Sequence, residues 1–183
     1  MILGWDVSTA IVGFVAISDD GKSCDFDYCD LRKIEDHDNK GDLLRDFVRK
    51  KMLLASGSSS VSSVHFIEDK LAGFSGGGSN AGTIMRLGAF NYLAGWLIHD
   101  IWGSQIERIH PSTVKAAMRK EGLLIPKGGD KKGLTLQWVS SRERSFPMEL
   151  NKNGKPQPWC YDMADAFVTA LVGRKRTLLA RQK

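Results

Sequence analysis

Apolar residues in the first part of the chain occur in short runs separated by polar turns. Residues 2–7 (ILGWDV), 12–18 (VGFVAIS) and about 22–30 are expected to form strands, and the turn sequence DDGK at 19–22 separates the second run from the third. Consecutive strands joined by tight turns pair in antiparallel order. The N-terminal part therefore predicts a three-stranded antiparallel meander.

The pattern then changes to helical spacing. Over residues 41–55, apolar side chains recur at the spacing of an amphipathic helix, with charged residues on the opposite face. A serine-rich linker leads to the apolar run VHFIED at 64–69, which is typical of a buried strand. Because a helix, a short loop and an apolar strand in succession build a parallel crossover, the sheet is expected to continue with parallel strands.

The second half contains a long helix over residues 84–102 that is apolar on almost all faces, as in a helix central to the core or shared with another subunit. The remaining predicted elements are one strand and three helices: strand 105–110 and helices 112–121, 131–144 and about 162–174. The order of elements predicts an α/β fold with a mixed five-stranded sheet, three strands antiparallel and then two parallel, flanked by helices.

Composition agrees with one globular domain over residues 1–183, because 42% hydrophobic and 26% charged residues exclude the disordered, collagen-like and membrane classes. The N-terminal sequence MILGWDVSTA lacks the pattern of a secretory signal. The three cysteines form no CxxC pair and no zinc-type cluster with histidine, which is typical of reduced thiols. We therefore expect a cytoplasmic protein with no membrane partner, and an organelle is the alternative.

Charge is distributed unevenly along the chain. The net charge is +5 and the isoelectric point is about 9.2. Basic residues concentrate from Lys115 onward and in the tail at about 174–183, whereas acidic residues concentrate between Asp19 and Asp46. This asymmetry fits a molecule with one phosphate-facing side, and it fits a solvated basic face with a loose tail equally well.

Four acidic residues stand out by position. Asp6 interrupts one predicted buried strand and Glu68 closes another, although desolvation makes carboxylates rare in such strands. For either residue alone, a strand-end side chain facing water is the alternative. Asp162 and Asp165, spaced i and i+3 near the start of a predicted helix, point to one side of it. A helix cap is the alternative there, but it accounts for one aspartate and not for the pair.

The chemistry of this set favours a metal. Four converging carboxylates repel one another unless a cation lies between them. Oxygen ligands without cysteine or histidine favour Mg²⁺ or Mn²⁺. Two such ions about 4 Å apart suit phosphodiester hydrolysis, because one activates water and the other stabilises the leaving oxygen. The spacing of the four residues in the sequence does not establish that they converge.

The segments GWDVSTAIVGFVAI, IED and YDMADAF, with the helix between them, together resemble the RuvC-type Holliday-junction resolvases of the ribonuclease H-like superfamily. Those proteins have Asp in the first strand, Glu at the end of the fourth and a D-x-x-D pair opening the last helix. The resemblance implies that Asp6, Glu68, Asp162 and Asp165 are catalytic and hold two Mg²⁺ ions, which Mn²⁺ can replace. It also implies an endonuclease that resolves four-way DNA junctions in a bacterial or phage-infected cell.

The family also has basic residues that contact the scissile strand and support catalysis. By resemblance these are Lys115, in the helix after the fifth strand, and Lys132, opening the next helix, with Lys131 as a near alternative. A solvated helix lysine is the alternative for each. The predicted DNA-binding set comprises Lys115, Lys131 and Lys132 together with Lys70, Leu71, Phe74, Arg86 and Arg119.

One position departs from the family pattern. Leu71 stands where bacterial members carry an aromatic residue that stacks on a base at the crossover, and Phe74 follows three residues later. Stacking contributes about 1–3 kcal/mol per base. This departure and the glycine-rich loop GFSGGGSNAG suggest a divergent, phage-type enzyme with a broader preference for branched DNA. The family acts as homodimers, for which helix 84–102, with Trp96 and Trp102, is the candidate surface; a purely internal helix is the alternative.

Other classes compete with this interpretation. GWDVSTAIVGF also resembles the first phosphate hairpin of actin-like and sugar-kinase ATPases, but those need a second such domain and a second glycine-rich hairpin. The P-loop pattern GxxxxGK[ST] is absent from the sequence. The remaining alternatives are a ribonuclease H-like nuclease that acts on flaps, forks or RNA–DNA hybrids, and a non-catalytic module that binds junctions.

Overall fold

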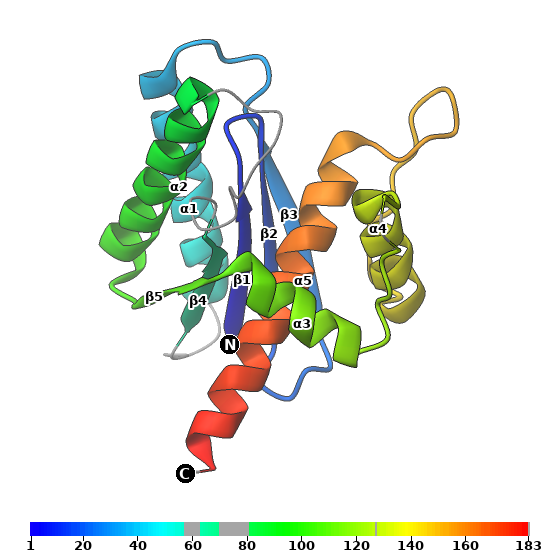
Figure 1. The fold of residues 1–183 in the computed structure, drawn as a ribbon. Coiled ribbons are helices and arrows are strands. Elements are labelled where there is room, and N and C mark those ends of the chain that lie inside the picture. Colours follow the sequence, from blue (N-terminus) through cyan, green and yellow to red (C-terminus); the bar gives the residue numbers. More distant parts are fainter. Residues whose placement is uncertain (57–62, 70–80, 127, 183) are drawn as a thin grey trace.

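The computed structural model describes residues 1–56, 63–69, 81–126 and 128–182 (Figure 1). Its core is one five-stranded sheet in the order β3-β2-β1-β4-β5. The strands are β1 (Ile2–Val7), β2 (Ile11–Ile17), β3 (Cys24–Asp30), β4 (Val64–Glu68) and β5 (Ile106–Ile109). The helices are α1 (His37–Ser56), α2 (Ala81–Trp102), α3 (Pro111–Lys120), α4 (Lys131–Arg142) and α5 (Pro158–Arg181).

The sheet has the mixed topology that the sequence predicts. Strands β1, β2 and β3 pair antiparallel, with Gly21 at a positive φ of 75° in the turn before β3. Strand β4 pairs parallel with β1, and β5 pairs parallel with β4. The predicted fold class, a five-stranded mixed sheet flanked by helices, is therefore confirmed.

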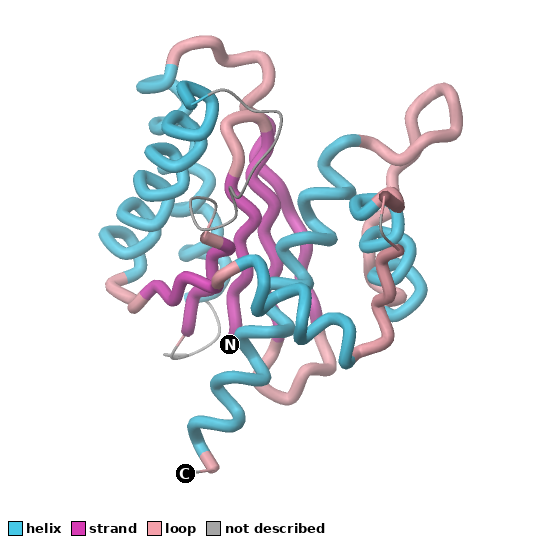
Figure 2. The backbone as a smooth tube through the Cα atoms, in the orientation of Figure 1, coloured by secondary structure: helices cyan, strands magenta, loops and turns pink. Residues whose placement is uncertain are grey.

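The two faces of the sheet are covered by different helices (Figures 1 and 2). Helices α1 and α2 cover one face, and α5 covers the other, with α3 and α4 packed against α5. Along β1, Leu3, Trp5 and Val7 belong to the core under α1 and α2, whereas Ile2 belongs to the core under α5. Because side chains alternate along a strand, Asp6 shares the α5 face with Ile2 and Gly4.

Helix α5 lies unusually close to the sheet. A Cβ atom at Gly4 would overlap the carbonyl oxygen of Ala166 and lie 2.6 Å from the Cβ of Ala170. A Cβ atom at Gly13 on β2 would overlap the carbonyl oxygen of Asp162. The glycines therefore let the backbone of α5 contact the central strands directly, which no larger residue at these positions permits.

Helix α5 is longer at both ends than the predicted helix 162–174. It begins at Pro158, whose fixed φ suits the first helical position, and Trp159 stacks on Tyr28 of β3 with ring centroids 4.8 Å apart. It continues to Arg181, so most of the basic segment 174–183 is helical and not a loose tail. Arg174 donates a hydrogen bond of 3.1 Å to the Asp19 carbonyl, and Lys175 forms an ion pair with Glu121.

Helix α2 buries only one of its sides in the core. It is therefore not the purely internal helix that was one of the two predictions. Phe90, Ala94 and Leu97 are buried, whereas Tyr92 and Trp96 are more than half exposed. The apolar residues that the sequence places on almost all faces of this helix therefore form two sides, one packed in the core and one exposed. No helix in the described part of the chain is both long and apolar enough to cross a membrane.

Candidate active site

Asp6 and Glu68 lie next to each other at the carboxyl ends of adjacent parallel strands. Trp5 of β1 pairs with Ile67 of β4, and Asp6 and Glu68 directly follow these two residues. Both occupy positions that face α5, because the side chain of Phe66, two residues before Glu68, packs in the α5 core. Asp6 is buried, and Glu68 is half-buried.

Helix α5 adds the second pair of carboxylates. Asp6 pairs with Gly13 of β2, and the backbone of Asp162 lies directly over Gly13. Asp162 is therefore held above the strand next to Asp6, and Asp165 follows three residues later on the same side of the helix. The N-cap of α5 is Gln157, so Asp162 and Asp165 lie beyond the first turn. Capping, the structural alternative for these residues, is thus excluded.

Lys132 reaches this site from the start of α4. Its Nζ donates a hydrogen bond of 3.1 Å to Oδ1 of Asp162. Burial has the largest single effect on this ammonium and lowers its pKa, but the charges of Asp162, Asp6 and Asp165 together outweigh burial and raise the pKa. Lys132, one of the two lysines predicted to support catalysis, therefore interacts electrostatically with three of the four carboxylates.

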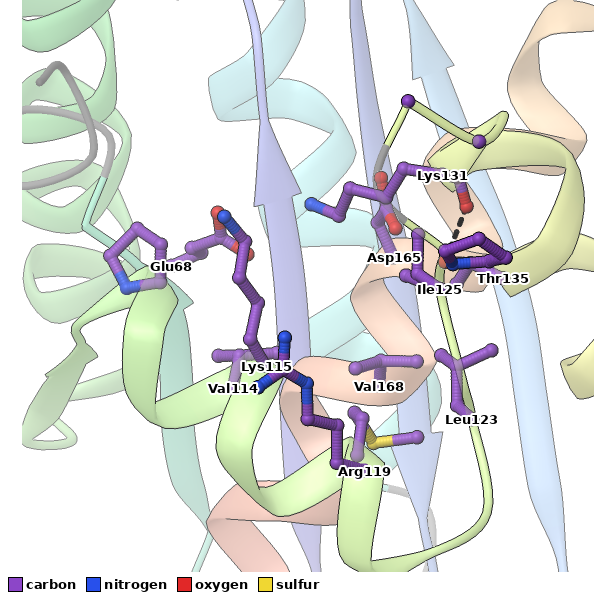
Figure 3. A pocket seen from close by; sticks show the side chains of 15 residues that line it. Glu68, Val114, Lys115, Arg119, Leu123, Ile125, Lys131, Thr135, Asp165 and Val168 are labelled. Carbon is purple, nitrogen blue, oxygen red and sulfur yellow. Dashed lines mark hydrogen bonds between the residues drawn. The ribbon is translucent and has the colours of Figure 1, made fainter. Parts of the chain in front are cut away.

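The other predicted basic residues of this region line a cavity of about 300 Å³ (Figure 3). Glu68 and Asp165 lie at one end of it, and Lys115 extends toward Glu68 from α3. Arg119 and Lys131 also line the cavity. Strand ends, α3, α4 and α5 thus bring four acidic and four basic side chains of the predicted set to one region of the molecule.

Asn91 is a positioning residue that the site predictions did not include. It is buried in α2, on the opposite face of the sheet, and its Nδ2 donates a hydrogen bond of 3.2 Å to the carbonyl oxygen of Glu68. Arg108 of β5 in turn donates to Oδ1 of Asn91 and lies 4.1 Å from the ring centroid of Tyr92. The sequence did contain a signal for Asn91, because it lies within the apolar part of a predicted helix and a buried amide needs a hydrogen-bond partner.

One predicted DNA-binding residue, Arg86, lies away from this site. Arg86 is exposed on α2, where it lines a separate depression with His37 and Asp38 and donates a 3.3 Å hydrogen bond to the Gly82 carbonyl. That helix covers the face of the sheet opposite to α5. Lys70, Leu71 and Phe74 lie outside the described residues.

The donor set is suited to a hard cation, but the carboxylates do not form a closed ligand set as they stand. Among the described residues, no group of three or more Asp, Glu, His or Cys side chains is arranged to hold a metal ion. Glu68 and Asp165 are half-buried and line the open cavity. Oxygen donors alone fit Mg²⁺ or Mn²⁺ in chemistry.

Comparison with known proteins identifies the fold. No protein-family profile and no curated protein sequence matches the chain. Among solved structures, a Thermus thermophilus RuvC structure is 16% identical with a TM-score of 0.61, and T. thermophilus RuvC in complex with a Holliday junction substrate is 13% identical with a TM-score of 0.59. Each alignment covers 97% of this chain and 95% of the other. The chain has a RuvC-like fold.

Proposed function

We propose that this protein is a Mg²⁺-dependent, structure-selective endonuclease that cuts branched DNA, chiefly four-way junctions, as a homodimer. The observation that carries the proposal is the position of Asp6 and Glu68 at adjacent strand ends, facing Asp162 and Asp165 of α5, in a RuvC-like fold. One solved structure of that fold, T. thermophilus RuvC, is bound to a Holliday junction substrate.

In this proposal the four carboxylates hold the metal. When bound, two Mg²⁺ ions supply Lewis-acid activation of water and stabilisation of charge at the leaving oxygen, and Mn²⁺ substitutes for them. Glu68 and Asp165 would complete the ligand set together with Asp6 and Asp162. Lys132, which contacts Asp162 in this structure, would bind the scissile phosphate when DNA is present.

The basic residues around the acids bind the DNA backbone. Lys115, Arg119 and Lys131 are exposed around the cavity, where they neutralise phosphates on either side of the cut. Leu71, in the place of a stacking aromatic, favours a broad preference among branched substrates, as in a divergent phage-type enzyme. The exposed apolar side of α2, which includes Tyr92 and Trp96, is the proposed dimer surface.

The test is cleavage of a labelled synthetic four-way junction in Mg²⁺ and in EDTA, with linear duplex and flap controls. Paired, symmetric nicks on the junction alone, lost in EDTA and in Asp6→Asn, are the expected result. Comparable cutting of flaps or forks would shift the function to a general branch nuclease. Tight junction binding without any cutting would show a binding protein on a nuclease fold.

A further inference from the structure

The cavity beside the acidic site has a mainly apolar lining. Beside Glu68 and Asp165, it is lined by apolar residues of α3, α5 and the loop that follows α3 (Figure 3). Its apolar walls are formed by Val114, Met118, Leu123, Ile125 and Val168. Such walls offer no hydrogen bond to a phosphodiester, but they favour a flat apolar group.

The three basic residues that line the cavity outnumber its two acids, Glu68 and Asp165, and favour an anionic ligand at the rim. Lys115, Arg119 and Lys131 all line it and are exposed to solvent. By contrast, Met118, Leu123 and Val168 are between 3% and 6% exposed, so the apolar wall lies deeper than the cations. A ligand that satisfies both parts has phosphate at one end and an apolar, planar group at the other, which is the chemistry of a nucleotide.

We infer that this cavity receives one unstacked nucleotide of the strand that is cut, with its base against the Ile125 wall and its phosphates on the cations. The inference rests on the proposed function and adds a base-binding subsite to it. Taking a base out of a stack costs least where pairing is already interrupted. A branch point supplies such a base, and a continuous duplex does not, so this subsite contributes to selection of branched DNA.

The experiment pairs a change in the cavity with a change in the DNA. Ile125→Trp fills the cavity from a loop position between α3 and α4, and Leu124→Trp is the matched control, because Leu124 is 73% exposed and is not a lining residue. A single abasic position is moved along the labelled strand of a four-way junction near the branch point. Binding is measured in EDTA by fluorescence anisotropy, which needs no cleavage.

One abasic position is expected to weaken binding by wild type and by Leu124→Trp about tenfold, because it removes the apolar contact of one base with the cavity wall. The same position should have little effect on Ile125→Trp, which has already lost the contact and should bind the intact junction about tenfold more weakly. Ile125→Thr, which keeps a branched side chain but makes the wall polar, serves in place of Ile125→Trp if thermal unfolding shows that the larger residue disrupts the fold.

The outcomes separate this inference from the proposed function. Two results would overturn the subsite and leave the proposed nuclease intact, provided that wild type binds and cuts junctions. In the first, no abasic position weakens binding by wild type; in the second, the abasic position weakens binding by Ile125→Trp equally. Failure of wild type to bind junctions at all would overturn both. An abasic effect in wild type and Leu124→Trp that disappears in Ile125→Trp supports the subsite.

Discussion

The two faces of the sheet are built from alternate residues of the same strands, yet they bury different chemistry. The face under α1 and α2 is an aromatic core in which Trp5 packs on Phe14 with ring centroids 4.6 Å apart. Its buried His65 accepts a 3.3 Å hydrogen bond from Nε1 of Trp5. The face under α5 also packs aromatic rings, with Phe26 against Phe146 and Phe167, but it buries the carboxylates of Asp6 and Asp162 beneath a closely packed helix.

This difference shows how a fold separates stability from chemistry. Because side chains alternate with a period of two, a shift of one residue in register would move Asp6 into the aromatic core and Trp5 onto α5. The aromatic core fixes the register, and the register then places the carboxylates. Substitutions on the two faces should accordingly differ in what they change, and five experiments compare the two sides of the molecule.

The largest expected effect is a loss of activity caused by a substitution on the α5 face. Asp6→Asn should lower junction cleavage about 100-fold or more, because it removes a charged ligand of the proposed metal site. Junction binding should be kept or become tighter, since a negative charge facing phosphate is removed. Asp46→Asn, at a side chain that is 75% exposed on α1, is the control. Loss of binding together with cutting would mean that Asp6 has a structural role.

Glycine substitutions on the two sides should differ in sign. Gly13→Ala should lower the free energy of unfolding by about 3 kcal/mol, because its Cβ overlaps the backbone of α5 at Asp162. In Gly41→Ala, the new Cβ is 3.6 Å from Leu93, an ordinary contact, and alanine should stabilise α1 by up to about 1 kcal/mol. Urea denaturation measures both. Equal effects would show that α5 is not closely packed on β2.

The exposed side of α2 should control assembly and not the fold. Trp96→Glu should weaken dimerisation by about 2 kcal/mol or more if Trp96 is a central interface residue, and it should leave the monomer folded. Leu179→Glu, at a residue 63% exposed near the end of α5, is the matched control. Sedimentation velocity distinguishes the two variants. An unchanged dimer would exclude this side of α2 as the interface.

His65 should make the aromatic core sensitive to acid. Burial lowers the pKa of His65 to about 3 from its ordinary value of 6.5, so the folded state resists a proton that the unfolded chain accepts. Stability from this residue is fully present above pH 6.5 and is lost as the pH falls toward 3, with a slope of about 1.4 kcal/mol per pH unit.

His65→Gln should remove this part of the slope, and His37→Gln, at an exposed position on α1, should not. Urea denaturation at several pH values between 4 and 7 compares the variants with wild type. The same slope in His65→Gln would assign the acid sensitivity to carboxylates elsewhere in the chain.

The smallest expected effect concerns the basic end of α5, which extends beyond the sheet at the end opposite to the acidic site (Figure 1). Arg176→Gln with Arg181→Gln should reduce the slope of log affinity against log salt by less than about 1 unit. Lys115→Gln with Arg119→Gln, at the cavity, should reduce it by about 2 units. An unchanged slope in the first pair would show that the end of α5 does not contact DNA.

Much of the fold could be predicted because its signals are local. The five strands lie within one or two residues of their predicted positions, since apolar runs and turn residues are contiguous in the sequence. Helices α1 and α2 begin earlier than their apolar spacing indicates, because the polar first turn of α1 and the small residues that open α2 carry no periodic signal. Helix α5 was the largest difference, because its ends depend on contacts of Trp159 and Arg174 with distant strands and turns.

The sequence by itself determined the order of the elements, the alternation that puts Asp6 on a single face, and the identity of the four candidate carboxylates. Only the tertiary structure decided that Lys132 contacts Asp162, that Asn91 holds the backbone of Glu68 from the other face, and which side of α2 is exposed. The physical reason is the range of the forces involved. Periodicity and turn preference act between neighbours, whereas these contacts join residues that become close only when α2, α4 and α5 pack on the sheet.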